Sequence, residues 1–176
     1  MSLSIRAKNA ALRVVLPWAS KPPVANVLCL IAIILNRPVG LTFTNNVSDH
    51  WGVDLIQCFL NNPQGKIVQV LSGEVFDVAV DLRKSSSSFG WWVATTLSAA
   101  NRLQHWIPPG FADGFLVTSA SADVFYKTTG YYAPQYERTI HWHDAAIGVQ
   151  WPLQVQPVLS AKDLQAGSLK NTELFD

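Results

Sequence analysis

Apolar and polar positions alternate with a period of two along the chain from residue 66 onward. The clearest case is Glu74–Leu82, where a face with Asp77 and Asp81 alternates with an apolar one that runs from Phe76 to Leu82. A period of two is typical of a β-strand with one buried face, so we expect a half-buried strand here. The positions expected to point inward or to lie at an interface are Phe76, Val78, Val80, Phe115, Val117 and Phe125.

Further strand-like runs follow between turn residues. They are Lys66–Leu71, Trp91–Leu97, Gly114–Ser119, Asp123–Thr128 and Thr139–His143, with Ala10–Leu16 and Leu41–Thr44 as additional candidates. Short strands at regular spacing favour a β-sandwich or barrel. The serine run Ser85–Ser88 is expected to be a solvated turn. The sequence therefore predicts an all-β domain with short helices only near the C-terminus.

Composition narrows the function classes. The 176 residues are 49% hydrophobic and 14% charged, which indicates a packed domain rather than a disordered chain. A net charge of +1 gives no bulk electrostatic case for nucleic-acid binding, which needs clustered Lys and Arg. Two cysteines are too few for a disulfide framework or a four-thiolate zinc site. The 7 Trp, 8 Phe and 4 Tyr suit a packed β core or a ring-binding pocket.

The first third of the chain differs from the rest. Residues 1–65 carry five basic and two acidic groups, whereas residues 66–176 carry eight basic and ten acidic groups. The apolar run Val24–Leu35 has 12 residues, too short for a membrane-spanning helix, which needs roughly 20. Asn36-Arg37-Pro38 follows it in place of a signal-cleavage site, so we expect a buried element and no membrane anchor. We divide the chain into an atypical segment, 1–62, and a core, 63–176.

Five strings within the core carry a resemblance to a known family. They are Gln64–Gly90, Leu97–Phe115, Asp123–Pro134, Ile147–Leu153 and Leu159–Asp163. In order and spacing this part of the chain resembles the dTDP-4-dehydrorhamnose 3,5-epimerases. These are sugar-nucleotide epimerases of the cupin, or jelly-roll, type that need no cofactor.

The resemblance implies a jelly-roll barrel, a homodimer with exchanged N-terminal strands, and a cytoplasmic enzyme. It implies conversion of dTDP-4-keto-6-deoxy-D-glucose to dTDP-4-keto-L-rhamnose, a precursor of surface polysaccharide, with neither metal nor nicotinamide. Segment 1–62 is expected to form an exchanged arm or an irregular stretch.

The implied reaction removes protons next to the C4 ketone, which requires a base, a stabiliser of the enolate oxygen and an acid on the other face. The resemblance assigns the proton donor to Tyr126 and the carboxylate that orients the base to Asp163. It assigns a fixed cation for the enolate or phosphate oxygens to Lys66. The remaining substrate-binding positions are Asp113, Trp106 and Tyr132.

The chain departs from the family pattern at three positions. The histidine that serves as base in the family reads Cys58, an arginine that meets the phosphates reads Leu55, and a pocket histidine reads Asp113. A thiol is mostly protonated at pH 7, so the sequence predicts an activity deficit of about 10²- to 10⁴-fold. His50 is the nearest histidine that could replace the base.

Two other hypotheses remain open at this level. The first is a catalytically impaired sugar-nucleotide-binding paralogue, with an N-terminal third that has diverged or is read from an altered coding sequence. The second is a metal-dependent cupin, in which His141 and His143 lie on one face of a strand and Asp144 or His105 completes the site. We expect no bound metal.

Overall fold

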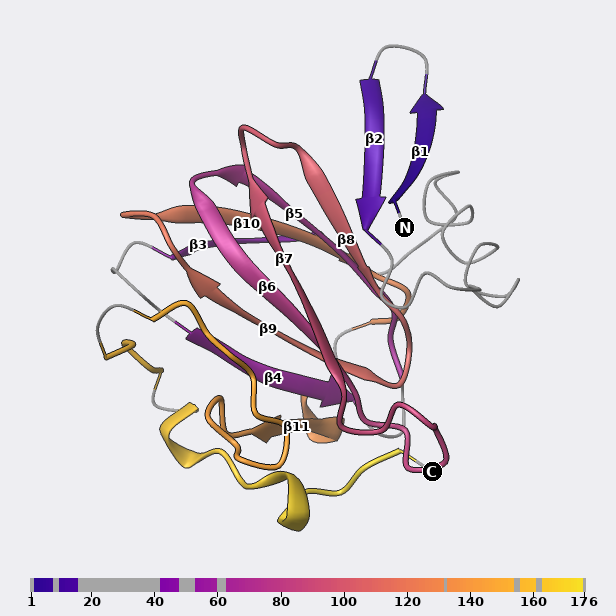
Figure 1. Ribbon diagram of the computed structural model, residues 1–176, viewed down its shortest axis with the longest axis vertical. Helices are drawn as coiled ribbons and strands as arrows, with labels where there is room; N and C mark the ends of the chain where they lie inside the picture. Colours follow the sequence, from indigo (N-terminus) through magenta and orange to yellow (C-terminus); the bar gives the residue numbers. More distant parts are fainter. Residues whose placement is uncertain are drawn as a thin grey trace.

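In a computed structural model, the backbone is described for residues 2–7, 10–15, 42–47, 53–59, 63–131, 133–153, 156–160 and 163–175. Side-chain surroundings are described within the part of the chain that begins at residue 63. Two sheets face each other (Figure 1) and enclose an apolar core. The predicted all-β jelly-roll architecture is confirmed.

The first sheet has six strands in the order β1-β2-β8-β5-β10-β3. Their bounds are β1 Ser2–Ala7, β2 Ala10–Val15, β8 Leu103–Ile107, β5 Lys66–Ser72, β10 Ala122–Thr128 and β3 Thr42–Val47. β2 runs parallel to β8, and the other neighbours are antiparallel. The β1–β2 hairpin therefore forms the edge beyond β8 (Figure 1).

The second sheet has five strands in the order β11-β4-β9-β6-β7. Their bounds are β11 Glu137–Ile140, β4 Val53–Phe59, β9 Phe111–Val117, β6 Glu74–Asp81 and β7 Trp92–Ser98. Three short 3₁₀ helices complete the described elements: η1 Pro134–Tyr136, η2 Asp163–Gln165 and η3 Leu169–Asn171. β3 and β4 come from the first 62 residues, and the division at residue 62 stays a prediction.

Strand β6 is buried on both faces, so the prediction of a half-buried strand is wrong. Val75 and Ala79 belong to the core between the sheets, together with Phe115 and Val117. Val78 belongs to a second core on the outer face of the same sheet, together with Val80, Leu82, Ile140, Ile147 and Leu169. The C-terminal segment supplies the partners of this second core and runs beside β4 and β11 (Figure 1, orange to yellow). The aspartate-bearing face of β6 is therefore the inner face.

Two strands, β8 and β11, differ from the sequence-based prediction. β8 was not predicted as a strand, and it lies between β5 and β2. β11 ends at Ile140, so His141 and His143 lie in the following turn and not on a strand face, as the metal-cupin hypothesis required. There the backbone N–H of His143 donates to Nδ1 of His141 at 3.2 Å.

The run Val24–Leu35 lies outside the described residues. Within the described part, no helix is long and apolar enough to cross a membrane.

The serine run forms the predicted turn, with Ser85 and Ser87 exposed, and it also helps to bind a buried carboxylate at the end of β6. The Asp81 side chain is fully buried and receives two hydrogen bonds from the Arg83 guanidinium, at 2.8 and 2.7 Å. The hydroxyls of Ser86 and Ser88 donate to it at 2.6 and 2.7 Å. Burial by itself raises the pKa of Asp81, but these hydrogen bonds outweigh it and lower the pKa to about 2.

We expect Asp81→Asn to lower the free energy of unfolding by about 2 kcal/mol at pH 7, the equivalent of the pKa depression. Because the folded-state pKa is below the unfolded value, this contribution is complete above about pH 4 and disappears as the pH falls toward 2. Urea unfolding measured from pH 7 to pH 2 should therefore show a smaller pH dependence for the variant than for the wild type.

Glu173 provides the matched control for this prediction. Its carboxylate accepts from Arg138 at 2.7 Å, but its side chain is 70% exposed. Exposed ion pairs contribute little, so Glu173→Gln should change stability by less than about 1 kcal/mol. Equal effects of the two substitutions would contradict the assignment of Asp81.

Candidate active site

Three polar side chains lie on adjacent strands on the inner face of the six-stranded sheet. In the register of β5 with its neighbours, Val68 is opposite His105 of β8 on one side and opposite Tyr126 of β10 on the other. Residues directly opposite one another share a face, and so do residues two apart on one strand. Val68, His105, Tyr126 and Lys66 therefore lie on one face. Val68 is part of the core between the sheets and Tyr126 packs against it, so this face is the inner one.

An ion pair joins the two sheets across the interior. Nζ of Lys66 on β5 contacts Oδ1 of Asp113 on β9, and the two side chains are only 9% and 19% exposed. A carboxylate at position 113 would by itself repel a diphosphate. The structure instead pairs this carboxylate with a lysine, which compensates its charge.

A second polar pair, which sequence reasoning missed, also joins the sheets. Nδ1 of His105 lies 2.6 Å from Oδ2 of Asp77 on β6, and both side chains are fully buried or nearly so. Burial raises the pKa of Asp77, and the charge of Asp113 raises it further, while His105 and Lys66 lower it; the balance is upward. The signal in the sequence was an aspartate between Val75 and Ala79, two apolar residues on the same face of β6.

Asp163 lies at the start of η2 and forms a reciprocal cap with Ser160. Its Oδ2 accepts from the Ser160 hydroxyl at 2.7 Å and from the Ser160 backbone N–H at 3.3 Å, while its own N–H donates to the Ser160 hydroxyl at 3.2 Å. The side chain is 2% exposed. Its other oxygen, Oδ1, is buried and accepts no hydrogen bond from any described residue. The Asp163 carboxylate therefore caps η2 through Oδ2, while Oδ1 is left as an acceptor for another group.

One further predicted site residue, Trp106, is not brought to this inner face. Trp106 is fully buried, but it is opposite Ile67 and so lies on the other face of the sheet from Lys66. It fills the space beside Gly65, where an added Cβ would lie 2.3 Å from its ring. In the register of β4, Gln57 is opposite Asp113 and Cys58 is opposite Arg138.

Cys58 and Tyr132 are two further residues that the family resemblance assigns to the site. The side chain of Cys58 lies outside the described residues, and so does the whole of Tyr132. Their assignments as base position and substrate contact stay predictions.

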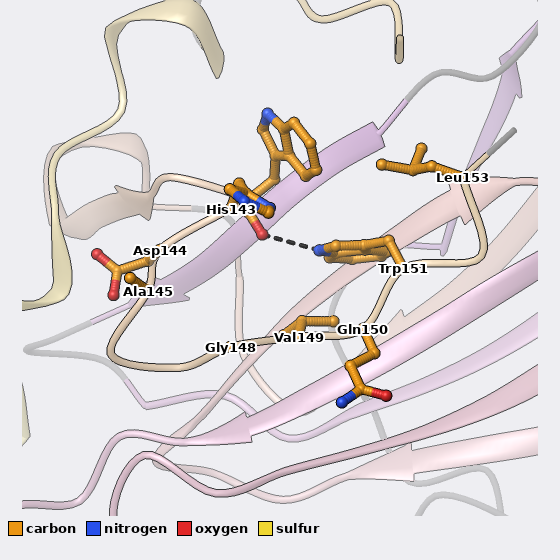
Figure 2. Close-up of a pocket in the computed structure, with 9 residues that line it drawn as sticks. His143, Asp144, Ala145, Gly148, Val149, Gln150, Trp151 and Leu153 are labelled. Carbon is orange, nitrogen blue, oxygen red and sulfur yellow. Dashed lines mark hydrogen bonds between the residues drawn. The ribbon is translucent and has the colours of Figure 1, made fainter. Parts of the chain in front are cut away.

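A pocket of about 360 Å³ lies apart from this interior, in the segment that follows β11 (Figure 2). It is lined by Trp142, His143, Asp144, Ala145, Gly148, Val149, Gln150, Trp151 and Leu153. The indole N–H of Trp151 donates to the Trp142 carbonyl at 2.8 Å, and the Asp144 carboxylate points away from Trp151. Asp144 accepts from the backbone N–H groups of Ala146 and Leu169, both at 2.9 Å. The pocket contains none of the site residues that the family resemblance assigns.

Metal ligands do not converge within the described part of the chain, where no group of three or more His, Cys, Asp or Glu side chains could hold an ion. His105, considered as a third ligand beside His141 and His143, lies inside the barrel and is bound to Asp77. The geometry that the metal-cupin hypothesis needs is therefore absent from these residues.

Comparison with known sequences identifies the relatives of this chain. A family model described as dTDP-4-dehydrorhamnose 3,5-epimerase matches residues 57–171. A dTDP-4-dehydrorhamnose 3,5-epimerase from Neisseria gonorrhoeae is 58% identical over 103 residues, which are 58% of this chain and 31% of that protein. One from Salmonella typhimurium is 55% identical over 115 residues, which are 65% of this chain and 63% of that protein. The match spans less than two thirds of the length of these relatives.

Comparison with solved structures extends the similarity over nearly the whole chain. The dTDP-6-deoxy-D-glucose-3,5-epimerase from Legionella pneumophila, solved in complex with dTDP-4-keto-L-rhamnose, superposes with a TM-score of 0.76 and 35% identity. The superposition covers 98% of this chain and 87% of that one. The shared architecture therefore includes the N-terminal strands as well as the core.

Proposed function

The chain belongs to the dTDP-4-dehydrorhamnose 3,5-epimerase family, and we propose that it converts dTDP-4-keto-6-deoxy-D-glucose to dTDP-4-keto-L-rhamnose. The observation that carries the proposal is the similarity, over 98% of the chain, to a solved epimerase bound to dTDP-4-keto-L-rhamnose. The Lys66–Asp113 pair and Tyr126, gathered inside the barrel, supply the polar groups that such chemistry needs.

The roles of the residues follow from the chemistry of an enolate. Lys66 is the cation that stabilises the oxygen of the C4 ketone as charge develops on it. Tyr126 returns a proton to the face opposite the base. Asp163, with its unused Oδ1, orients the group at the base position, where this chain has Cys58. Asp113 sets the position of Lys66, and Tyr132 belongs to the substrate-binding surface.

We further propose that the enzyme acts as a homodimer in the cytoplasm, with the product used for surface polysaccharide. The family resemblance supports these three statements. Size-exclusion chromatography with light scattering tests the dimer: a mass near 39 kDa, twice the 19.4 kDa of the chain, is expected.

The epimerase names of the matched relatives favour catalysis over a non-catalytic sugar-nucleotide binder. Solvent exchange decides between the two. The protein is incubated with dTDP-4-keto-6-deoxy-D-glucose in D₂O, and deuterium at C3 and C5 is followed by NMR together with the formation of dTDP-4-keto-L-rhamnose. A binder would shift the nucleotide resonances without exchanging either proton.

A further inference from the structure

Among the described residues, one buried imidazole lies inside the barrel and has no role in the proposed function. The chain has four histidines. His141 and His143 follow β11 outside the barrel, and His50 lies outside the described residues. We propose that His105, oriented by Asp77, accepts the sugar proton in this protein, in place of the group at position 58. This inference rests on the proposed epimerase function and names the base within it.

Asp77 orients the ring of His105. The 2.6 Å contact joins Nδ1 of His105 to Oδ2 of Asp77 between the two sheets, where both side chains are at most 1% exposed. A carboxylate that accepts the Nδ1–H bond stabilises the tautomer in which Nε2 carries a lone pair. Because burial makes the Asp77 carboxyl more basic, it is a stronger acceptor for this hydrogen bond.

The other ring nitrogen is unused. Nε2 of His105 is buried and has no hydrogen-bond partner among the described residues. Buried polar atoms are nearly always paired, so an unpaired ring nitrogen on the inner face of the barrel indicates a site that another molecule completes.

The strand register places His105 and the proton donor Tyr126 on either side of Val68. His105 and Tyr126 flank Val68 on the same face of the sheet, one strand away on each side. Strands are about 4.8 Å apart, so the two Cα atoms are separated by roughly 10 Å, with only Val68 between them on this face. Lys66 is two residues from Val68 on the same face, about 7 Å along the strand. Base, acid and cation therefore surround one apolar position.

The proton transfers balance in this arrangement. Nε2 of neutral His105 takes the proton from C3 or C5, and the electrons of the broken C–H bond move into the enolate, whose oxygen lies beside Lys66. Tyr126 then gives its hydroxyl proton to the opposite face of the same carbon, and the electrons return to form the new C–H bond. Exchange with water restores neutral His105 and protonated Tyr126 before the second carbon reacts.

The test is deuterium exchange into C3 and C5 by the full chain with dTDP-4-keto-6-deoxy-D-glucose in D₂O. We expect His105→Gln to lower the exchange rate by about 10²- to 10⁴-fold, the contribution of a general base. His141→Gln is the matched control and should exchange at the wild-type rate. Absence of exchange in the wild type would refute the proposed function. Wild-type exchange that His105→Gln leaves unchanged, or that Cys58→Ala abolishes while His105→Gln does not, would overturn this inference alone.

A second measurement does not require a folded variant. In wild-type protein labelled with ¹⁵N-histidine, we expect one imidazole with a protonated Nδ1 and an Nε2 whose resonance shifts on saturation with dTDP-glucose, which lacks the C4 ketone. Asp77→Asn should change the tautomer of this ring and lower kcat more than it raises KM. An Nε2–H tautomer, or an Nε2 resonance that dTDP-glucose leaves unmoved, would contradict the proposal.

Discussion

Lys66→Met should lower the rate of deuterium exchange at C3 and C5 by about 10²- to 10³-fold, the usual effect of removing one group that stabilises an oxyanion. Lys66 is 7% exposed, so its charge acts in a poorly solvated interior, where it interacts more strongly than at the surface. The same NMR assay measures the rate. The nucleotide affinity, measured separately by calorimetry, should show whether the loss is in binding or in turnover.

Lys66→Met also leaves Asp113 without the partner shown by the structure. Removal of one member of a buried pair costs roughly 3–5 kcal/mol, and Asp113 is partly exposed, so we expect a loss of stability near the lower end. The double variant Lys66→Met/Asp113→Asn should recover most of this stability but none of the exchange. Lys127→Met is the matched control, because Lys127 is opposite Ile67 and so lies on the other face from Lys66. Recovery of exchange in the double variant would show that Lys66 acts only through folding.

The sequence predicts the architecture well because alternation is local. Runs such as Lys66–Leu71 and Asp123–Thr128 form β5 and β10 with small shifts at their ends. It assigns the wrong face of β6, because both faces are buried and a face with two aspartates resembles a solvent face. The partners of those aspartates, His105 and Arg83, occur elsewhere in the chain, and the alternation within β6 does not reveal them.

The candidate site likewise depends on contacts between distant parts of the chain, which the sequence does not reveal. A family resemblance supplies positions one by one, and so it gives Lys66, Tyr126 and Asp163, as well as Cys58 at the base position. It does not show that Lys66 pairs with Asp113, because that contact joins residues 47 apart on different sheets. Nor does it single out His105, whose relation to Tyr126 depends on the register of three strands. The sequence-based deficit and the His105 proposal therefore lead to opposite expectations for the wild-type rate, and the exchange assay distinguishes them.

Tyr126→Phe should separate proton exchange from inversion. If Tyr126 only donates a proton to the face opposite the base, its removal leaves abstraction intact. The base then returns a proton or deuteron to the face it came from. We expect formation of dTDP-4-keto-L-rhamnose to fall by about 10²- to 10⁴-fold, with a much smaller loss of deuterium entry into C3 and C5.

The substitution suits this test because it removes only one hydroxyl from a half-buried ring that packs against the inner core. Tyr136→Phe, in η1, is the matched control and should affect neither quantity. Both rates can be read from one NMR time course, since exchange removes the C3 and C5 proton signals of the substrate whereas inversion creates new product signals. Equal losses of exchange and inversion in Tyr126→Phe would mean that the hydroxyl takes part in abstraction as well. The donor and the acceptor would then be one group, and the arrangement of His105 and Tyr126 on opposite sides of Val68 would not explain the stereochemistry.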